Sequence, residues 1–323
     1  MRLPRWIAVL ALTLAYPGLS LAVPNAGASA QEMQTPPTSA AGAPLLMNVD
    51  EVVFTFHATD ARGATVKGLT AGDIRIRDNG VPPRRIVAFD EVQNRAIRVG
   101  ILLDASESMQ QTMEANKGIA KNFAERFLLM GTDEAFVSSF GYGSDVLRSW
   151  TRDPEQVVRG ILSASEKDAH GGTALFNTVF RACSYSFGHA DPMATGNFIL
   201  LFSDGEDNAG LTSLDEAARA CQGSNTAVFV FLSTSSTKGD STGPKALREL
   251  AAKTGGGVFR ADDSERASWN DLSDIESEMR NQYRVVYSPA VLKHDGAFHE
   301  IELQPPDRVN KIAVRSGYFA PQK

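Results

Sequence analysis

The 323-residue sequence has only two cysteines and five histidines, and it has no long run of basic residues. It carries 32 lysines and arginines against 38 acidic residues, a net charge of −6. Binding to a nucleic-acid backbone requires clustered positive charge, so this balance argues against a nucleic-acid partner. The histidines lack the spacing of metal ligands and are expected at the surface: His57, His170, His189, His294 and His299.

Long hydrophobic runs are equally scarce. Outside the first thirty residues, no stretch approaches the roughly 20 apolar residues that span a bilayer. Hydrophobic residues make up 43% of the chain and charged residues 22%. These are values of a globular protein, and they exclude a mainly disordered, collagen-like or multi-span membrane chain. We therefore expect no transmembrane span once a leader is removed.

Residues 1–30 have the pattern of a signal peptide. Arg2 and Arg5 precede an apolar stretch over residues 6–15, and small residues offer cleavage after Ala22 or after Ala30. A basic start, a short apolar core and a small-residue end are typical of secretory signals. The alternative is an uncleaved membrane anchor. We expect the mature protein to be secreted or periplasmic.

Export gives the two cysteines a meaning, because disulfides persist outside the cytoplasm. Cys183 and Cys221 each lie near the end of an expected helix, and those helices should share one face of a sheet. A disulfide would close a loop of 38 residues. The alternative, two buried thiols that act as small hydrophobic side chains, stays open.

The remaining chain divides by pattern. Residues 31–47 are rich in proline and small residues, which favours a flexible linker. Residues 48–95 and 282–323 contain strand patterns only, and residues 96–281 alternate strands with helices. Alternation predicts an α/β fold with a doubly wound, mostly parallel, Rossmann-like sheet. The outer segments are expected to pair into a small flanking β-sandwich-like subdomain.

Three polar segments follow strands or open helices in the alternating part. The first strand ends in Asp104-Ala105-Ser106-Glu107-Ser108, a D-x-S-x-S sequence. Thr173 follows two glycines at the start of a helix, and Asp204 follows an apolar strand that ends at Ser203. Ligands of such sheets bind at the carboxyl ends of the strands. Hydroxyl and carboxylate oxygens are hard ligands, suited to Mg²⁺ or Mn²⁺. The alternative is that these side chains only cap helices and turns.

These residues resemble the metal-ion-dependent adhesion site of the von Willebrand factor A-domain family, which combines D-x-S-x-S, a threonine and an aspartate. The motifs occur in the family's order over roughly residues 97–262. The resemblance implies that Ser106 and Ser108 bind the ion directly, and that Thr173, Asp104 and Asp204 bind it directly or through water. It also implies an open coordination position that accepts an Asp or Glu of a partner protein.

The wider chain is similar to a group of exported bacterial proteins related to the von Willebrand factor A domain, notably from acidobacteria. The similarity rests on a leading segment, 68–74, and on two trailing segments, 282–287 and 315–319. These segments are less diagnostic than the metal-site motifs.

The expected function is therefore a metal-dependent, adhesion-type binding module and not an enzyme. Hydrolysis would need a base beside the ion. The loops offer Glu107, Glu206 and Asp207 as acids, but no histidine or lysine in a recognisable arrangement. Two alternatives remain: an envelope scaffold that acts through its β subdomain, and a metal-dependent hydrolase.

Overall fold

The computed structural model describes residues 51–165, 172–188, 194–233, 242–261 and 265–322. The expected signal peptide and linker, residues 1–47, lie outside this part of the chain, as do His170 and His189. None of the helices described is long and apolar enough to cross a membrane.

A six-stranded sheet forms the centre of the α/β domain, with the strand order β6-β5-β4-β7-β8-β9. All neighbouring strands are parallel except β5 and β6, which are antiparallel. The α/β fold with a mostly parallel sheet is thereby confirmed. The strands are β4 (Ile97–Asp104), β5 (Glu134–Phe140), β6 (Ser144–Thr151), β7 (Gly196–Ser203), β8 (Thr226–Leu232) and β9 (Val258–Arg260).

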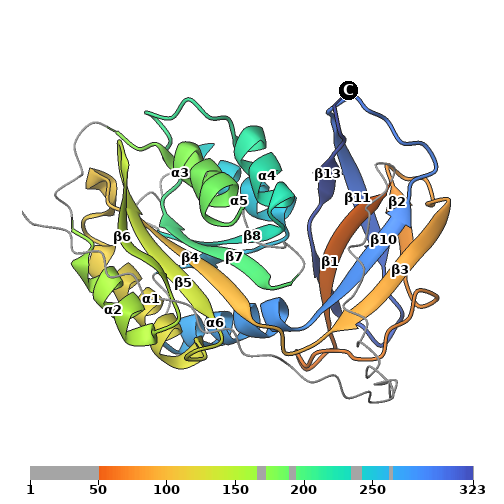
Figure 1. Ribbon diagram of the computed structural model, residues 1–323, viewed down its shortest axis with the longest axis horizontal. Coiled ribbons are helices and arrows are strands. Elements are labelled where there is room, and N and C mark those ends of the chain that lie inside the picture. Colours follow the sequence, from red (N-terminus) through yellow and green to blue (C-terminus); the bar gives the residue numbers. More distant parts are fainter. Residues whose placement is uncertain (1–50, 166–171, 189–193, 234–241, 262–264, 323) are drawn as a thin grey trace, which may run out of the picture. The chain divides into compact units, whose positions relative to one another are not determined.

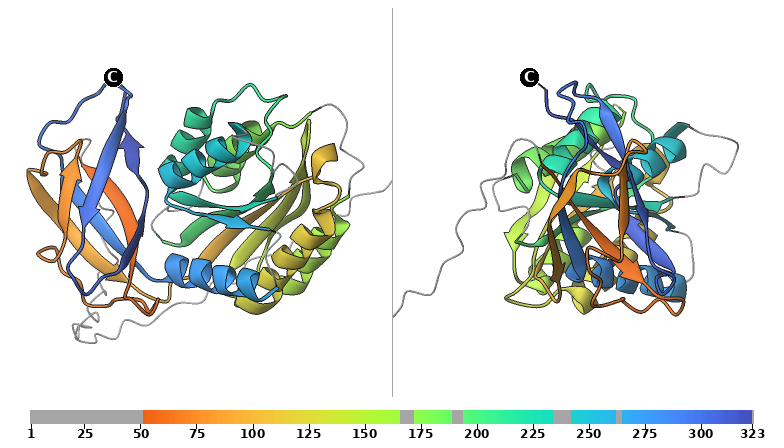
Figure 2. Two further views of the ribbon diagram at one scale, coloured as in Figure 1. Left: turned by 180° about the vertical axis from the view of Figure 1, so that it is seen from behind. Right: turned by 90° about the vertical axis from the view of Figure 1, so that its right-hand side faces the viewer.

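Helices cover both faces of this sheet (Figure 1; Figure 2). One face carries α1 (Met113–Phe127), α2 (Pro154–Ser163) and α6 (Glu265–Arg280). The other face carries α3 (Leu175–Arg181), the π-helix η3 (Ala182–Ser186), α4 (Leu214–Gly223) and α5 (Thr242–Thr254). Because both faces are covered, β4, β7 and β8 are almost entirely buried and consist of near-continuous apolar runs.

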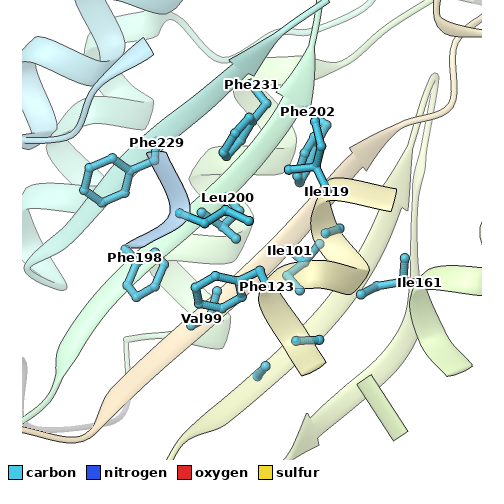
Figure 3. Packing of buried hydrophobic residues seen from close by; sticks show 14 of the residues in the cluster. Val99, Ile101, Ile119, Phe123, Ile161, Phe198, Leu200, Phe202, Phe229 and Phe231 are labelled. Atoms are coloured by element: carbon cyan, nitrogen blue, oxygen red, sulfur yellow. The ribbon is translucent and has the colours of Figure 1, made fainter. Parts of the chain in front are cut away.

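On the α1 face of the sheet, apolar residues at helical spacing pack against the strands. Ile119 and Phe123 are four residues apart on α1, so they lie on the same side of the helix. They pack against alternate residues of the sheet, such as Ile101 and Phe198 (Figure 3). The ring of Phe123 meets Phe198 edge-on, with the ring centroids 5.8 Å apart.

Two helix starts follow from local capping chemistry. The Asp153 side chain accepts a hydrogen bond from the amide of Glu155, and Pro154 occupies the first turn of α2. Ser213 and Glu216 form a reciprocal capping box at the start of α4.

The segments on either side of the α/β domain share two antiparallel sheets. One has the order β12-β1-β10-β3 and the other β13-β11-β2. Their strands are β1 (Val52–Thr59), β2 (Arg75–Asp78), β3 (Arg85–Val92), β10 (Gln282–Ser288), β11 (Phe298–Gln304), β12 (Lys311–Val314) and β13 (Gly317–Phe319). Residues of both sheets form a separate apolar cluster. Within it, the rings of Phe56 and Tyr283 stack with their centroids 5.1 Å apart.

The expectation of surface histidines is wrong at two positions. His57 is 5% exposed, and its Nδ1 lies 2.5 Å from the carbonyl oxygen of Asn281. His299 is 3% exposed and lies between two carboxylates. Its Nδ1 is 3.7 Å from Oδ1 of Asp78, and its Nε2 is 3.4 Å from Oδ1 of Asp295. Sequence spacing did not reveal these partners, because each except Asp295 is distant along the chain.

Cys183 and Cys221 form a disulfide that joins η3 to α4. Both cysteines belong to the same apolar cluster on one face of the sheet, as the placement of their helices predicts. The bond separates residues 38 positions apart and ties two neighbouring helices together.

Replacing both cysteines with alanine is expected to lower the free energy of unfolding by about 3–4 kcal/mol, because the open chain gains loop entropy when it unfolds. Urea unfolding under oxidising conditions measures the difference. Reductant should bring the wild type to the stability of the double variant and leave the variant unchanged. Equal stability of both proteins under oxidising conditions would contradict a structural disulfide.

Candidate metal site

The candidate ligands gather at the carboxyl edge of the six-stranded sheet. β4 ends at Asp104, and the neighbouring β7 ends at Ser203. The two strands are parallel, with Leu103 opposite Phe202, so Asp104 and Ser203 leave the sheet side by side. The Ser203 hydroxyl donates a hydrogen bond of 2.7 Å to Oδ2 of Asp104. This contact joins two of the three loops that the sequence analysis singled out.

Asp104 is the most constrained carboxylate of the site. It is 1% exposed, and its Oδ1 accepts a hydrogen bond of 3.0 Å from the amide of Ser106. Hydrogen bonds to both carboxylate oxygens therefore fix the orientation of the Asp104 side chain. Ser106 is buried beside it, whereas Ser108 is exposed, and the two serine hydroxyls lie 3.3 Å apart. The oxygen atoms of the D-x-S-x-S motif therefore run from the buried carboxylate of Asp104, through the buried hydroxyl of Ser106, to the exposed residue Ser108.

Thr173 is fixed by its backbone. Its amide donates to the side-chain oxygen of Asn208 at 2.7 Å, and its carbonyl accepts from the amides of Asn208 and Ala209. Gly172 has a φ of +98°, and a Cβ there would lie 2.4 Å from the same Asn208 oxygen. Only glycine therefore suits this turn, and the Gly-Thr pattern has a local physical reason.

Asp204 occupies the loop that follows β7. It is buried, and its Oδ1 accepts a hydrogen bond of 3.1 Å from the amide of Glu206. The next residue, Gly205, has a φ of +89°, and a Cβ on it would approach the backbone of Gly243 to 2.5 Å. The loop that carries Asp204 is thus packed against the start of α5.

The electrostatics of the site favour a divalent cation. Burial, together with the nearby charge of Asp204, raises the pKa of Asp104 to about 6, although hydrogen bonds from Ser106 and Ser203 act in the opposite direction. Among the described residues, neither carboxylate forms an ion pair with a basic side chain. Two buried carboxylates without a cationic partner are costly, and a bound dication would neutralise them.

The donor set also fits the chemistry of Mg²⁺ or Mn²⁺. Asp104, Ser106, Ser108, Thr173 and Asp204 offer only oxygen atoms. In the described ranges there is no cluster of three or more His, Cys, Asp or Glu side chains that could hold a metal, so hydroxyls must complete this site. Oxygen donors of this kind suit hard cations, which commonly keep water in the remaining positions.

Three supporting residues escaped the sequence analysis or received another role there. Ser203 aligns Asp104, and Asn208 fixes Thr173. Asp207, which the sequence analysis named only among the acids of the loops, accepts a hydrogen bond from the amide of Leu175 at 2.9 Å and so caps α3. The only signal for Asp207 and Asn208 is that they lie three and four residues after Asp204, which does not specify a partner 32 to 35 residues away.

The raised pKa of Asp104 predicts a pH dependence of cation binding. The ion needs the ionised carboxylate, whereas the metal-free protein holds a proton there below a pH of about 6. Lowering the pH from about 7.5 to about 5 should weaken apparent Mn²⁺ binding roughly tenfold through this group. Calorimetric titration at both pH values measures it, and an unchanged affinity would contradict it.

Comparison with known proteins places these motifs in a family. The family model of the von Willebrand factor type A domain matches residues 99–277. No curated protein matches the chain in sequence.

Several solved structures are similar in fold. The conserved hypothetical protein BatB from Bacteroides thetaiotaomicron is 20% identical, covers 56% of this chain and 97% of its own, and has a TM-score of 0.44. The von Willebrand factor type A protein from Catenulispora acidiphila is 15% identical. The match covers 76% of this chain and 74% of that protein, with a TM-score of 0.44. Proximal thread matrix protein 1 from the mussel byssus, solved with zinc in its metal-ion-dependent adhesion site (MIDAS) motif, is 17% identical. The match covers 58% of this chain and 48% of that protein, with a TM-score of 0.47.

The family match extends over more than half of the chain and includes every strand of the central sheet and all three candidate loops. This protein therefore belongs to the von Willebrand factor type A domain family.

Proposed function

We propose that this protein is an exported binding module that captures an acidic side chain of a partner protein through Mg²⁺ or Mn²⁺. Asp104, Ser106, Ser108, Thr173 and Asp204 hold the ion in this proposal. The family often binds partners through such a metal site. Within the family, the flanking β segments favour the exported bacterial group that the sequence resembles.

The observation that carries the proposal is the graded burial of the site. Asp104 and Asp204 are buried and oriented by hydrogen bonds, while Ser108 of the same motif is exposed. An ion held by these groups would be reachable from solvent. Two carboxylates balance the charge of a dication without filling its coordination sphere, so a further carboxylate from outside can bind.

We assign no catalytic step to the site. Hydrolysis requires a base positioned beside the ion. The two carboxylates next to the ligands, Glu107 and Glu206, are both exposed. Neither side chain is held toward the site by a hydrogen bond in the described part of the chain, so both are free to point into solvent.

Panning of phage-displayed random peptides on the immobilised mature protein tests the proposal. Peptides that bind in Mg²⁺ and elute with EDTA should be enriched in Asp or Glu. The Thr173→Ala variant should capture none of them, because it removes an expected ligand and leaves both carboxylates. Capture by this variant, or enrichment without an acidic residue, would overturn the bridging role of the ion.

Export is part of the same proposal. It rests on Arg2, Arg5 and the apolar stretch that follows them. Amino-terminal sequencing of the protein recovered outside the cytoplasm should show a start after Ala22 or after Ala30. A full-length chain in the membrane fraction would instead indicate an uncleaved anchor.

A further inference from the structure

Two large apolar side chains stand exposed beside the candidate metal site. Tyr142, in the turn between β5 and β6, is 66% exposed, and Leu211, in the loop between β7 and α4, is 96% exposed. Single exposed apolar residues are common and need no explanation by themselves. Here, however, both belong to loops that are hydrogen-bonded to the short segment that begins at Thr173.

Hydrogen bonds attach these loops to that segment. The carbonyl of Gly141, next to Tyr142, accepts from the amide of Ala174 at 2.8 Å. On the other loop, the amides of Leu211 and Thr212 both donate to the side-chain oxygen of Asn177, at 3.0 and 2.7 Å. The backbones that carry the two apolar side chains are thereby anchored within one helical turn of Thr173. Because the backbones of these loops are held in place, less loop ordering has to occur when a partner binds, which favours the two residues as contacts.

Two exposed acidic side chains also lie on the loops of the candidate metal site. Glu107 lies between the two serines of the motif, and Glu206 lies two residues after Asp204. Both are exposed, and they come from loops that follow the adjacent strands β4 and β7. A dication would neutralise Asp104 and Asp204, but Glu107 and Glu206 would keep their negative charge. Complementary charge on a partner at this place is therefore basic.

We infer that Tyr142 and Leu211 determine which acidic segment this site accepts. The partner is a protein segment whose metal-binding Asp or Glu is flanked by a large apolar residue, which packs on Tyr142 and Leu211, and by a Lys or Arg, which faces Glu107 and Glu206. This inference rests on the proposed function and adds the chemistry of the partner to it.

The peptides selected in the presence of Mg²⁺ test this inference. Around the acidic residue they should be enriched in large apolar residues and in Lys or Arg. The double variant Tyr142→Ala/Leu211→Ser should bind the selected peptides about tenfold more weakly or worse, as expected for the loss of anchor residues. Its affinity for Mg²⁺ alone should be unchanged, because neither residue is an expected ligand.

Val291→Ala is the matched control. Val291 is 68% exposed, like Tyr142, but lies in the loop between β10 and β11, away from the metal-site loops. It should bind the peptides as the wild type does. Charge reversal with Glu107→Lys/Glu206→Lys should remove the preference for Lys or Arg in a new selection and retain the acidic residue.

The outcomes separate the two proposals. Metal-dependent acidic peptides without an apolar or basic preference, bound equally by wild type and Tyr142→Ala/Leu211→Ser, would overturn this inference and leave the proposed function intact. If no metal-dependent acidic peptide is selected although Mg²⁺ binds, the proposed function fails and the inference with it.

Discussion

Replacing Asp104 with alanine is expected to abolish saturable binding of Mg²⁺ and Mn²⁺, with affinity at least about 100-fold lower than in the wild type. Loss of residues that only support metal ligands costs about 10–100-fold, and Asp104 is itself an expected ligand. Its two oxygens are oriented by Ser106 and Ser203, so no neighbouring side chain can take its place without movement. Calorimetric titration of the metal-stripped protein measures the loss.

Glu107→Ala is the control for this experiment, because it removes an exposed carboxylate of the same loop. It should keep wild-type affinity. Thermal unfolding gives a second readout: excess ion should stabilise the wild type, by about 2.7 kcal/mol at a concentration 100 times the dissociation constant, and should not stabilise Asp104→Ala. Equal binding by Asp104→Ala and wild type would refute the assigned site, and the search for a binding surface would move to the β subdomain.

A second large effect is expected away from the site. Asp133→Ala should lower the free energy of unfolding by about 3–5 kcal/mol, because it removes the buried counter-charge of Arg280 and leaves that arginine only the partly exposed Glu276. Both carboxylate oxygens of Asp133 bind the guanidinium of Arg280, at 3.1 and 2.6 Å. The same carboxylate accepts the amides of Ile97 and Leu129 at 3.0 and 2.7 Å. One substitution thus removes four hydrogen bonds where α6 ends against the start of β4.

Urea unfolding measures this cost. Glu155→Ala is the matched control, because its ion pair with Arg159 is exposed on both sides and should contribute less than about 1 kcal/mol. The double variant Asp133→Leu/Arg280→Met should recover part of the stability, since it leaves no buried charge without a partner. A loss below 1 kcal/mol for Asp133→Ala would show that the pair does not hold α6 in place.

The element order was predictable because most of its signals are local. Buried parallel strands require continuous apolar runs, and β4, β7 and β8 have them. The start of α2 at Pro154 follows from Asp153 and Pro154 themselves. The carboxyl ends of parallel strands meet at one edge of a sheet, so the strand pattern by itself predicts that the loops carrying Asp104 and Asp204 lie at the same edge.

Other features depend on pairs of residues that are far apart in the sequence. The trailing segment, predicted to contain strands only, forms β10, β11, β12 and β13, but which sheet each strand joins depends on distant partners: β12 pairs with β1, whereas β13 pairs with β11. The sequence is compatible with free thiols as well, and the disulfide depends on η3 and α4 lying side by side in the structure. His57 is buried through a contact 224 residues away, which no local pattern indicates.

The sequence by itself determined the family, the alternation of strands and helices, and the candidate ligands, because each depends on short motifs with a local structural meaning. Only the tertiary structure decided how the ligands are held: Ser203 against Asp104, and Asn208 against Thr173. The same holds for the exposure of Tyr142 and Leu211 beside the site. Hydrogen bonds and burial between distant segments arise only when the strands are placed in one sheet, and sequence spacing does not encode them.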